Sequence, residues 1–320
     1  MATYQTYQSI GNREDLTDMI YDISPTETPF MSSIGKTKAT GVLHEWQTDS
    51  LSDATLANAA VEGADATSAT LAPTTRVGNR TQISQKTIQI AGTEETVDKA
   101  GRKSEKAYQL AKASSELKRD MEKIMLANQA ATAGDSTTAR TLGSLQAWLN
   151  TNAVLGAGGT AGSLGTTARV SGTDRAFTEP LLKVAVKSAF TNGGNPTVLM
   201  VSPTQKQVVS TFAGIAEQRY AAPANKQTTI IGAADVYLSD FGTLSVVPNR
   251  FTTADDESTT GQGEQAFVLD PEYAATAFLR PFQTNELAKT GDSEKTQLVV
   301  EYTLEVKNEA AHALVADLSI

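Results

Sequence analysis

The sequence predicts an α+β protein that joins compact units to long segments without a core of their own. The chain has 320 residues, enough for about two domains of 100 to 200 residues each. One segment repeats apolar residues at helical spacing, and the last third alternates short strand patterns with turn residues. The part before residue 92, by contrast, is largely polar and is interrupted by proline and glycine.

Composition and charge exclude several classes of function. Lys and Arg total 27 against 36 Asp and Glu, and the resulting net charge of -9 argues against a protein whose main task is to bind nucleic acid. With no cysteine and only two histidines, the chain has no disulfide, thiolate metal site or cysteine nucleophile. It has neither a signal pattern nor an apolar run of about 18 residues, so we expect a cytoplasmic, non-membrane protein.

Residues 1–45 are predicted to form an extended arm with a short helix at 13–21. Pro25, Pro29 and Gly35 interrupt any longer helix or strand. Residues 42–52 and 82–91 have strand composition, and we expect them to be the two limbs of a long hairpin. Because a hairpin of that length is only marginally stable in water without a core, we also expect it to pack against another surface.

A long helix is predicted to begin after Thr93 as N-cap and to continue to about residue 128, a length of about 50 Å at 1.5 Å per residue. Apolar or small residues recur on one face, at Ala107, Leu110, Ala111, Ser114, Leu117, Met121, Ile124 and Met125. The other side, which includes Glu105, Glu116, Asp120 and Glu122, carries still more lysines and arginines. This charged side is either a solvated face of the helix or a surface that faces a polyanion.

Residues 130–172 are rich in Gly, Ala, Thr and Ser and are predicted to be loops that mark a boundary. A mixed pattern follows, with a helix at 181–190, a strand at 197–201 and a helix from Ser202 to about residue 212. The remainder is predicted to be mainly strands, at 228–231, 235–238, 244–247, 266–269, 275–279, 298–306 and 312–318.

We expect neither an enzyme nor a metal or cofactor site. Gly156, Gly158 and Ala161 fit a dinucleotide-binding spacing, but the flanking residues lack the strand and helix that such a site needs. Spacing alone supplies no nucleophile or carboxylate for His44 or His312, so structural or surface roles are expected for both. The sequon at Asn79 is interpreted as chance, since nothing indicates secretion.

Three stretches of the sequence are similar to one known family. They are residues 13–16 with 23–30, then Asp240-Phe241-Gly242 with Val247-Pro248-Asn249-Arg250, and finally Leu279-Arg280-Pro281 with residues 287–292 and 301–313. Together they resemble the major head (capsid) proteins of tailed bacteriophages. The resemblance implies the HK97-like major capsid fold. Its regions would be an N-terminal arm at 1–45, an E-loop hairpin at 46–92, a spine helix with connecting loops of the P-domain at 93–179, an A-domain at 180–262 and further P-domain strands at 263–320.

The resemblance implies a shell subunit. Copies would assemble as pentamers and hexamers into an icosahedral head around packaged double-stranded DNA, with a portal protein as partner. The virion would be its location and the host cytoplasm its place of assembly. The alternatives are an encapsulin-like shell, which has the same fold, and a phage tail or surface protein, which predicts repeats and little helix.

Candidate contact residues follow from the same resemblance. We expect subunits to meet at Pro25, Pro29, Phe30, Trp46, Pro73, Arg76 and Arg80, and DNA to lie near Lys112, Lys118 and Lys123. Some members of the wider fold join subunits by an isopeptide bond from an E-loop lysine, but residues 45–85 contain no lysine. A non-covalent shell is therefore expected. Any scaffolding or cement protein is expected to be separate, because the arm begins at Met1.

Overall fold

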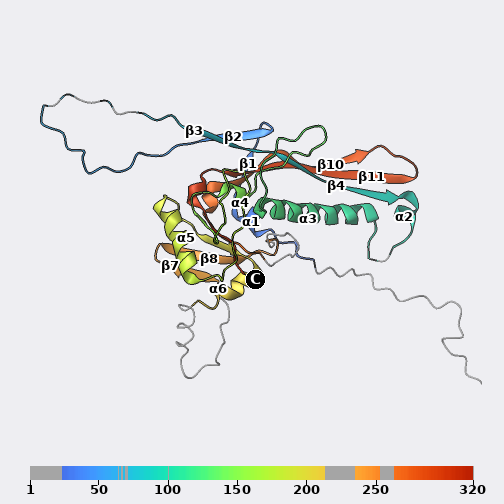
Figure 1. Ribbon diagram of the computed structural model, residues 1–320. Helices are drawn as coiled ribbons and strands as arrows, with labels where there is room; N and C mark the ends of the chain where they lie inside the picture. The colour runs from blue at the N-terminus through green and yellow to red at the C-terminus, as the bar shows by residue number, and fades with distance from the viewer. Residues whose placement is uncertain are drawn as a thin grey trace, which may run out of the picture.

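The computed structural model describes residues 24–63, 65, 68, 71–99, 101–212, 235–252 and 263–319. Within these residues the chain forms three sheets, one long helix and several short helices (Figure 1). The architecture is α+β, and this prediction is confirmed. The predicted helix at 13–21 and the predicted strand at 228–231 lie outside the described residues.

A four-stranded sheet and the long helix form the elongated part of the body (Figure 1). The sheet order is β1-β10-β11-β4, with β1 parallel to β10 and the other pairs antiparallel. Helix α3 (Glu105–Leu126) packs along this sheet and buries Leu117, Met121 and Met125 in the core beneath it. The strands are β1 (Gly35–Lys38), β4 (Gln82–Ala91), β10 (Ala274–Leu287) and β11 (Ser293–Val306).

A six-stranded mixed sheet with the order β5-β12-β9-β6-β8-β7 forms the second unit. Its central strands are apolar at consecutive positions because both faces are covered. Leu199 and Val201 face a core with α5 (Glu179–Thr191) and α6 (Pro203–Val209), whereas Met200 faces the core shared with α3 and α4 (Leu145–Trp148). The strands are β5 (Ala153–Val154), β6 (Val198–Val201), β7 (Val236–Ser239), β8 (Gly242–Pro248), β9 (Ala266–Leu269) and β12 (Ala313–Val315).

The long helix is shorter than the sequence predicts, and its N-cap is not Thr93. A single turn, α2 (Gly92–Thr96), ends after β4, and α3 starts only at Glu105, with Ser104 as its N-cap. Gly101 has φ +76, a left-handed conformation that interrupts a helix. The Ser104 side chain accepts a hydrogen bond from the amide of Ala107 and begins α3 there.

The predicted hairpin pairs differently from expectation. Strand β2 (Leu43–Thr48) pairs with β3 (Thr75–Arg80), a strand that the sequence analysis did not predict. The predicted return limb, β4, has the expected bounds but pairs with β11 in the four-stranded sheet. One residue, Thr81, separates β3 from β4, so the chain passes directly from the hairpin into the body.

The mixed pattern of the second half is confirmed in outline. Helices α5 and α6 and strands β6 to β9 lie at or within about two residues of the predicted ranges. Strands β10 and β11 run beyond their predictions into an extension in which β11 also pairs with β4, and β12 is shorter. The predicted boundary region 130–172 contains only α4, β5 and isolated bridges.

Candidate assembly surface

The hairpin β2–β3 carries a loop between residues 49 and 74, and its described residues extend away from the body of the molecule (Figure 1). Its described apolar side chains are almost fully exposed: Leu51 is 97% exposed, Leu56 106%, Val61 80% and Leu71 89%. Apolar side chains gathered in one exposed segment are typical of a surface that binds another protein. The loop is therefore the first candidate for contact between subunits.

The base of this hairpin is fixed by Asn79 in β3. Its side chain is 0% exposed and makes four hydrogen bonds, two as donor and two as acceptor. The amide nitrogen donates to the carbonyl oxygens of Gly143 and Leu304, each at 2.8 Å. The amide oxygen accepts from the backbone N–H groups of Gly143 at 2.8 Å and Arg80 at 2.9 Å. Asn79 thus uses its whole hydrogen-bonding capacity, and as a buried residue it accounts for the sequon without glycosylation.

A buried carboxylate fixes Thr81, the residue between β3 and β4. Glu301 of β11, 4% exposed, accepts a hydrogen bond from the Thr81 hydroxyl at 2.9 Å. It also pairs with Arg140 and, at 2.8 Å, with Arg280. Arg140 donates to the Thr81 carbonyl as well. Charge-assisted bonds of this kind hold the direction in which the hairpin leaves the sheet.

Strand β2 has separate contacts with the body. His44 lies 3.2 Å from Glu305, which also accepts from the Thr37 hydroxyl at 2.7 Å. The ring of Trp46 stacks on that of Trp148, with centroids 5.3 Å apart. Both limbs of the hairpin are therefore anchored at the base, while the loop is not.

The predicted contact residues are distributed unevenly over this surface. Pro73 and Arg76 are exposed at the loop end of the hairpin, and Arg76 forms an ion pair with Glu45 at 3.2 Å. Arg80 is half-buried at the base. Trp46 is half-buried against its own chain, so only part of its ring is open to a neighbour.

The arm residues divide in the same way. Pro25 and Pro29 are half-buried, the latter at the start of α1 (Pro29–Ser33). Phe30 is 0% exposed and packs in the core of its own chain. This placement corrects the prediction for Phe30: because its ring is one of the largest buried groups of its own core, its side chain does not reach a neighbouring subunit.

The three predicted DNA-facing lysines do not share one side of α3. At about 100° per residue, Lys112 and Lys123 point within about 20° of each other, and Lys118 lies about 120° from Lys112. Lys112 and Lys118 are exposed and Lys123 is half-buried. The predicted polar side is also wrong in part, since Glu105 and Glu122 are buried.

The other positions considered in the sequence serve the fold. The Gly156 amide donates to Asp317 at 2.7 Å, and Asp317 pairs with the buried Arg169, so a carboxylate of the same chain occupies the place of a phosphate. His312 is buried, and burial lowers its pKa to about 4; its Nδ1 accepts from the Asp270 amide at 3.2 Å.

Among the described residues, no group of three or more His, Asp or Glu side chains is placed to share a metal ion. None of the described helices has the length and apolar character needed to cross a bilayer.

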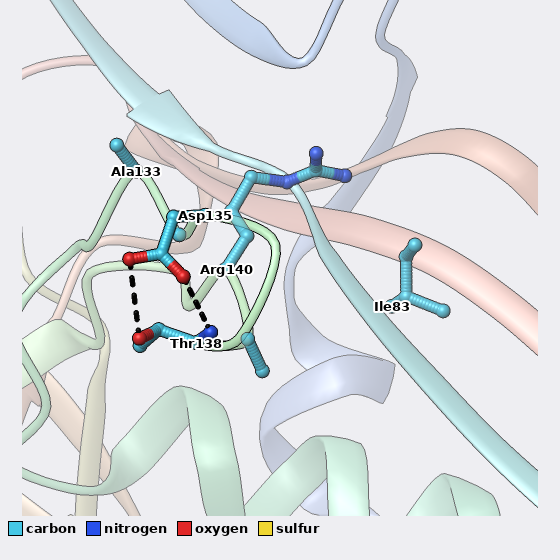
Figure 2. A pocket seen from close by; sticks show the side chains of 7 residues that line it. Ile83, Ala133, Asp135, Thr138 and Arg140 are labelled. Carbon is cyan, nitrogen blue, oxygen red and sulfur yellow. Dashed lines mark hydrogen bonds between the residues drawn. The ribbon is translucent and has the colours of Figure 1, made fainter.

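An open hollow of about 320 Å³ lies beside the hairpin base, between Ile83 and the loop at 133–140 (Figure 2). Figure 2 shows Asp135 directed at Thr138 of the same loop. Hydrogen bonds from the backbone amide and hydroxyl of Thr137, and from Thr138, lower the pKa of Asp135 to about 2. Arg140 is bound to Glu301 and Thr81. Because both charged groups are bound within the chain, the hollow does not have the free polar groups of a ligand site.

Sequence reasoning missed the residues that fix the hairpin, namely Asn79, Glu301 and Arg140. Most of their partners are 59 to 225 positions away in the chain, so no local spacing indicates them. The exposed leucines of the loop were a weak signal, since they are the apolar residues of an otherwise polar segment.

One family model and several solved structures match nearly the whole chain, whereas a curated relative matches part of it. The model of the family described as "SU10 major capsid protein" matches residues 2–319. The major capsid protein of Escherichia phage Phieco32 is 38% identical over 129 residues, which is 40% of this chain and only 37% of that relative. A cyanophage A-1(L) capsid chain is 12% identical with a TM-score of 0.67, covering 99% of this chain and 100% of its own. An encapsulin of Synechococcus elongatus is 9% identical with a TM-score of 0.56, covering 100% and 97%.

Proposed function

The chain belongs to the SU10 major capsid protein family, and from this premise we propose that it closes an icosahedral head around double-stranded DNA. It is a major capsid protein of a bacteriophage with the HK97-like fold. In the proposal, copies meet as pentamers and hexamers, a portal protein occupies one opening, and assembly takes place in the host cytoplasm. The role is structural rather than catalytic.

The observation that carries the proposal is the exposed apolar loop on an anchored base. Leu51, Leu56, Val61 and Leu71 have no cover within the described part of their own chain. Asn79 and Glu301 hold the base of the same hairpin rigidly. An apolar segment held out from the body in a fixed direction is suited to the surface of a second copy. Pro73 and Arg76 at its end, Arg80 and Trp46 at its base, and Pro25 and Pro29 beside α1 are the proposed contact residues.

The experiment that tests this replaces Leu51, Leu56 and Leu71 together by Ser. Burying each leucine contributes about 1.5 to 3 kcal/mol, so we expect folded subunits that no longer form shells at concentrations where the wild type does. Negative-stain electron microscopy and sedimentation velocity measure the outcome. Thr55→Ser in the same loop is the matched control and leaves assembly unchanged. Wild-type assembly by the triple leucine variant would contradict the proposal.

Contact with DNA is proposed for the exposed cations of α3. Because Lys112 and Lys123 lie on one side of the helix and Lys118 on another, the two sides are tested separately. If the first side faces DNA, Lys112→Gln with Lys123→Gln reduces genome retention at low salt and makes retention less dependent on salt, because each lost phosphate contact removes one release of counterions. Lys118→Gln tests the other side in the same way. Lys187→Gln on α5 is the control. Unchanged retention in both α3 variants would contradict a DNA-facing α3.

We propose that the shell is held by non-covalent contacts, because residues 45–85 contain no lysine for a cross-link. Any scaffolding or cement protein is proposed to be separate. Covalent ladders on a denaturing gel of mature shells would contradict this. The encapsulin alternative shares the fold, and the family match supports the phage capsid instead. A phage tail or surface protein would have repeats and little helix. The described residues show no repeat and include the long helix α3.

A further inference from the structure

A buried carboxylate joins three distant parts of the chain. Glu122 of α3 is 0% exposed and accepts hydrogen bonds from the backbone amides of Phe30 at 2.7 Å and Met31 at 2.9 Å, both in α1. It also accepts from the side-chain nitrogen of Asn249 at 2.7 Å, just beyond β8. We call these four residues the Glu122 junction.

Among the described residues, no cation is paired with the Glu122 carboxyl group. The bonds to Glu122 all come from neutral N–H groups, and burial raises its pKa despite them. A buried ionised group is costly to leave without its donors. Loss of one donor therefore raises the cost of keeping Glu122 buried and ionised, and this cost acts on the other two elements that hold it.

Asn249 extends the junction into the six-stranded sheet. Its backbone amide donates to the Val201 carbonyl of β6 at 2.8 Å, and its side-chain oxygen accepts from the Phe251 amide at 2.8 Å. The Arg119 guanidinium of α3 lies 5.5 Å from the centre of the Phe251 ring. On the other side, α1 begins only five residues after the first described residue, Ser24, at the end of the amino-terminal segment.

We propose that Glu122 is a positioning residue that couples the amino-terminal arm to the six-stranded sheet, so that binding of the arm by a neighbouring copy changes the order of the residues around Asn249. The inference rests on the proposed function, because it takes a second copy as the partner of the arm. Coupling between two sites is reciprocal. A change at Asn249 should therefore be detected at α1, because the Phe30 amide of α1 binds the same Glu122 oxygen as the Asn249 side chain.

The first test measures hydrogen exchange by mass spectrometry in unassembled full-length subunits. Asn249→Ala should speed exchange in the peptide at 28–34, which contains the Phe30 and Met31 amides, by about tenfold, as expected when a buried charged group loses a hydrogen-bond donor. Asn192→Ala, in the same unit but away from Glu122, is the control. Unchanged exchange at 28–34 in the Asn249 variant would overturn the proposal.

The second test uses assembled shells and Glu122→Gln, with Glu116→Gln as a control of equal charge change on the same helix. In wild-type shells we expect exchange to slow at 28–34 and at 247–252 together. In Glu122→Gln shells it should slow at 28–34 alone, and equal slowing at both peptides would overturn the coupling. Failure of the wild type to assemble contradicts the proposed function instead, and the subunit experiment then decides the coupling by itself.

Discussion

The six-stranded sheet and the β2–β3 hairpin use apolar residues in opposite ways. In the sheet, Leu199, Met200, Phe267 and Val268 are all 0% exposed, and consecutive side chains enter the two cores on opposite faces. In the hairpin loop, Leu56 and its apolar neighbours are exposed, and only the base is held, by polar groups. The sheet is stabilised by its own chain, whereas the loop is suited to stabilisation by another. In this protein, exposed apolar surface and a missing core indicate function.

The largest effect should come from the sheet. Phe267→Ala removes a fully buried ring and is expected to lower the free energy of unfolding by about 3 to 5 kcal/mol. Chemical denaturation of unassembled subunits measures it. Leu238→Ala on the edge strand β7, where the side chain is 77% exposed, is the matched control and should change little. If both variants lost a similar free energy of unfolding, burial would not distinguish the residues of the sheet from exposed ones.

A smaller effect is expected at the hairpin base. Asn79→Ala leaves the buried Gly143 amide and two carbonyl groups without their partner, at a cost of about 1 to 3 kcal/mol. Thr74→Ala, which removes an exposed bond to Gln47, is the control. If the base sets the hairpin direction, Asn79→Ala also reduces the yield of closed shells. A variant of full stability and full shell yield would show that Asn79 does not hold the hairpin.

The pH dependence of Glu122 sharpens the comparison further. Burial raises its pKa above the ordinary 4.5, so the folded chain binds this proton more tightly than the unfolded chain. The stability contributed by the group is then fully present below pH about 4.5 and is lost as pH rises through the raised pKa. Glu122→Gln should remove this component from the pH profile of unfolding, while Glu116→Gln keeps it. An identical profile in wild type and Glu122→Gln would contradict the assignment.

The smallest effect on subunit stability should come from the exposed loop. Leu56→Ser is expected to change the free energy of unfolding by less than about 0.5 kcal/mol, since the side chain has no cover to lose. The same variant should weaken assembly. Destabilisation of the unassembled subunit by 2 kcal/mol or more, about the cost of exposing a buried leucine, would mean that the loop packs on its own chain.

Local sequence patterns predicted helices and strands correctly where the apolar spacing within one segment is enough to define that segment. Strands β4 and β9 have their predicted bounds, and the apolar spacing of α3 is confirmed from Leu117 to Met125. The predicted helix start at Thr93 was wrong. Gly101 adopts a left-handed conformation that interrupts a helix before Ser104, and the apolar spacing of the sequence does not reveal that conformation. Pairing was also beyond local reasoning, since β4 is bound to β11, about 200 positions later.

The hairpin as a contact surface stays a prediction, and the residues that fix its base were missed. A hairpin in need of a partner follows from polarity and length, and Pro73 and Arg76 are exposed as such a surface requires. Phe30 and Glu122 were misjudged for one reason: burial depends on which elements converge, and here α1, α3 and the end of β8 converge on Glu122. Composition cannot show that convergence.

The position of β12 has a consequence for synthesis on the ribosome. This strand, residues 313–315, lies inside the six-stranded sheet between β5 and β9, and β11 lies inside the four-stranded one. Neither sheet can be completed until these late residues have been translated, and nascent chains fold as their segments emerge. A translation product that ends before β11 lacks Glu301, and with it the bonds to Thr81 and Arg140 that hold the base of the hairpin.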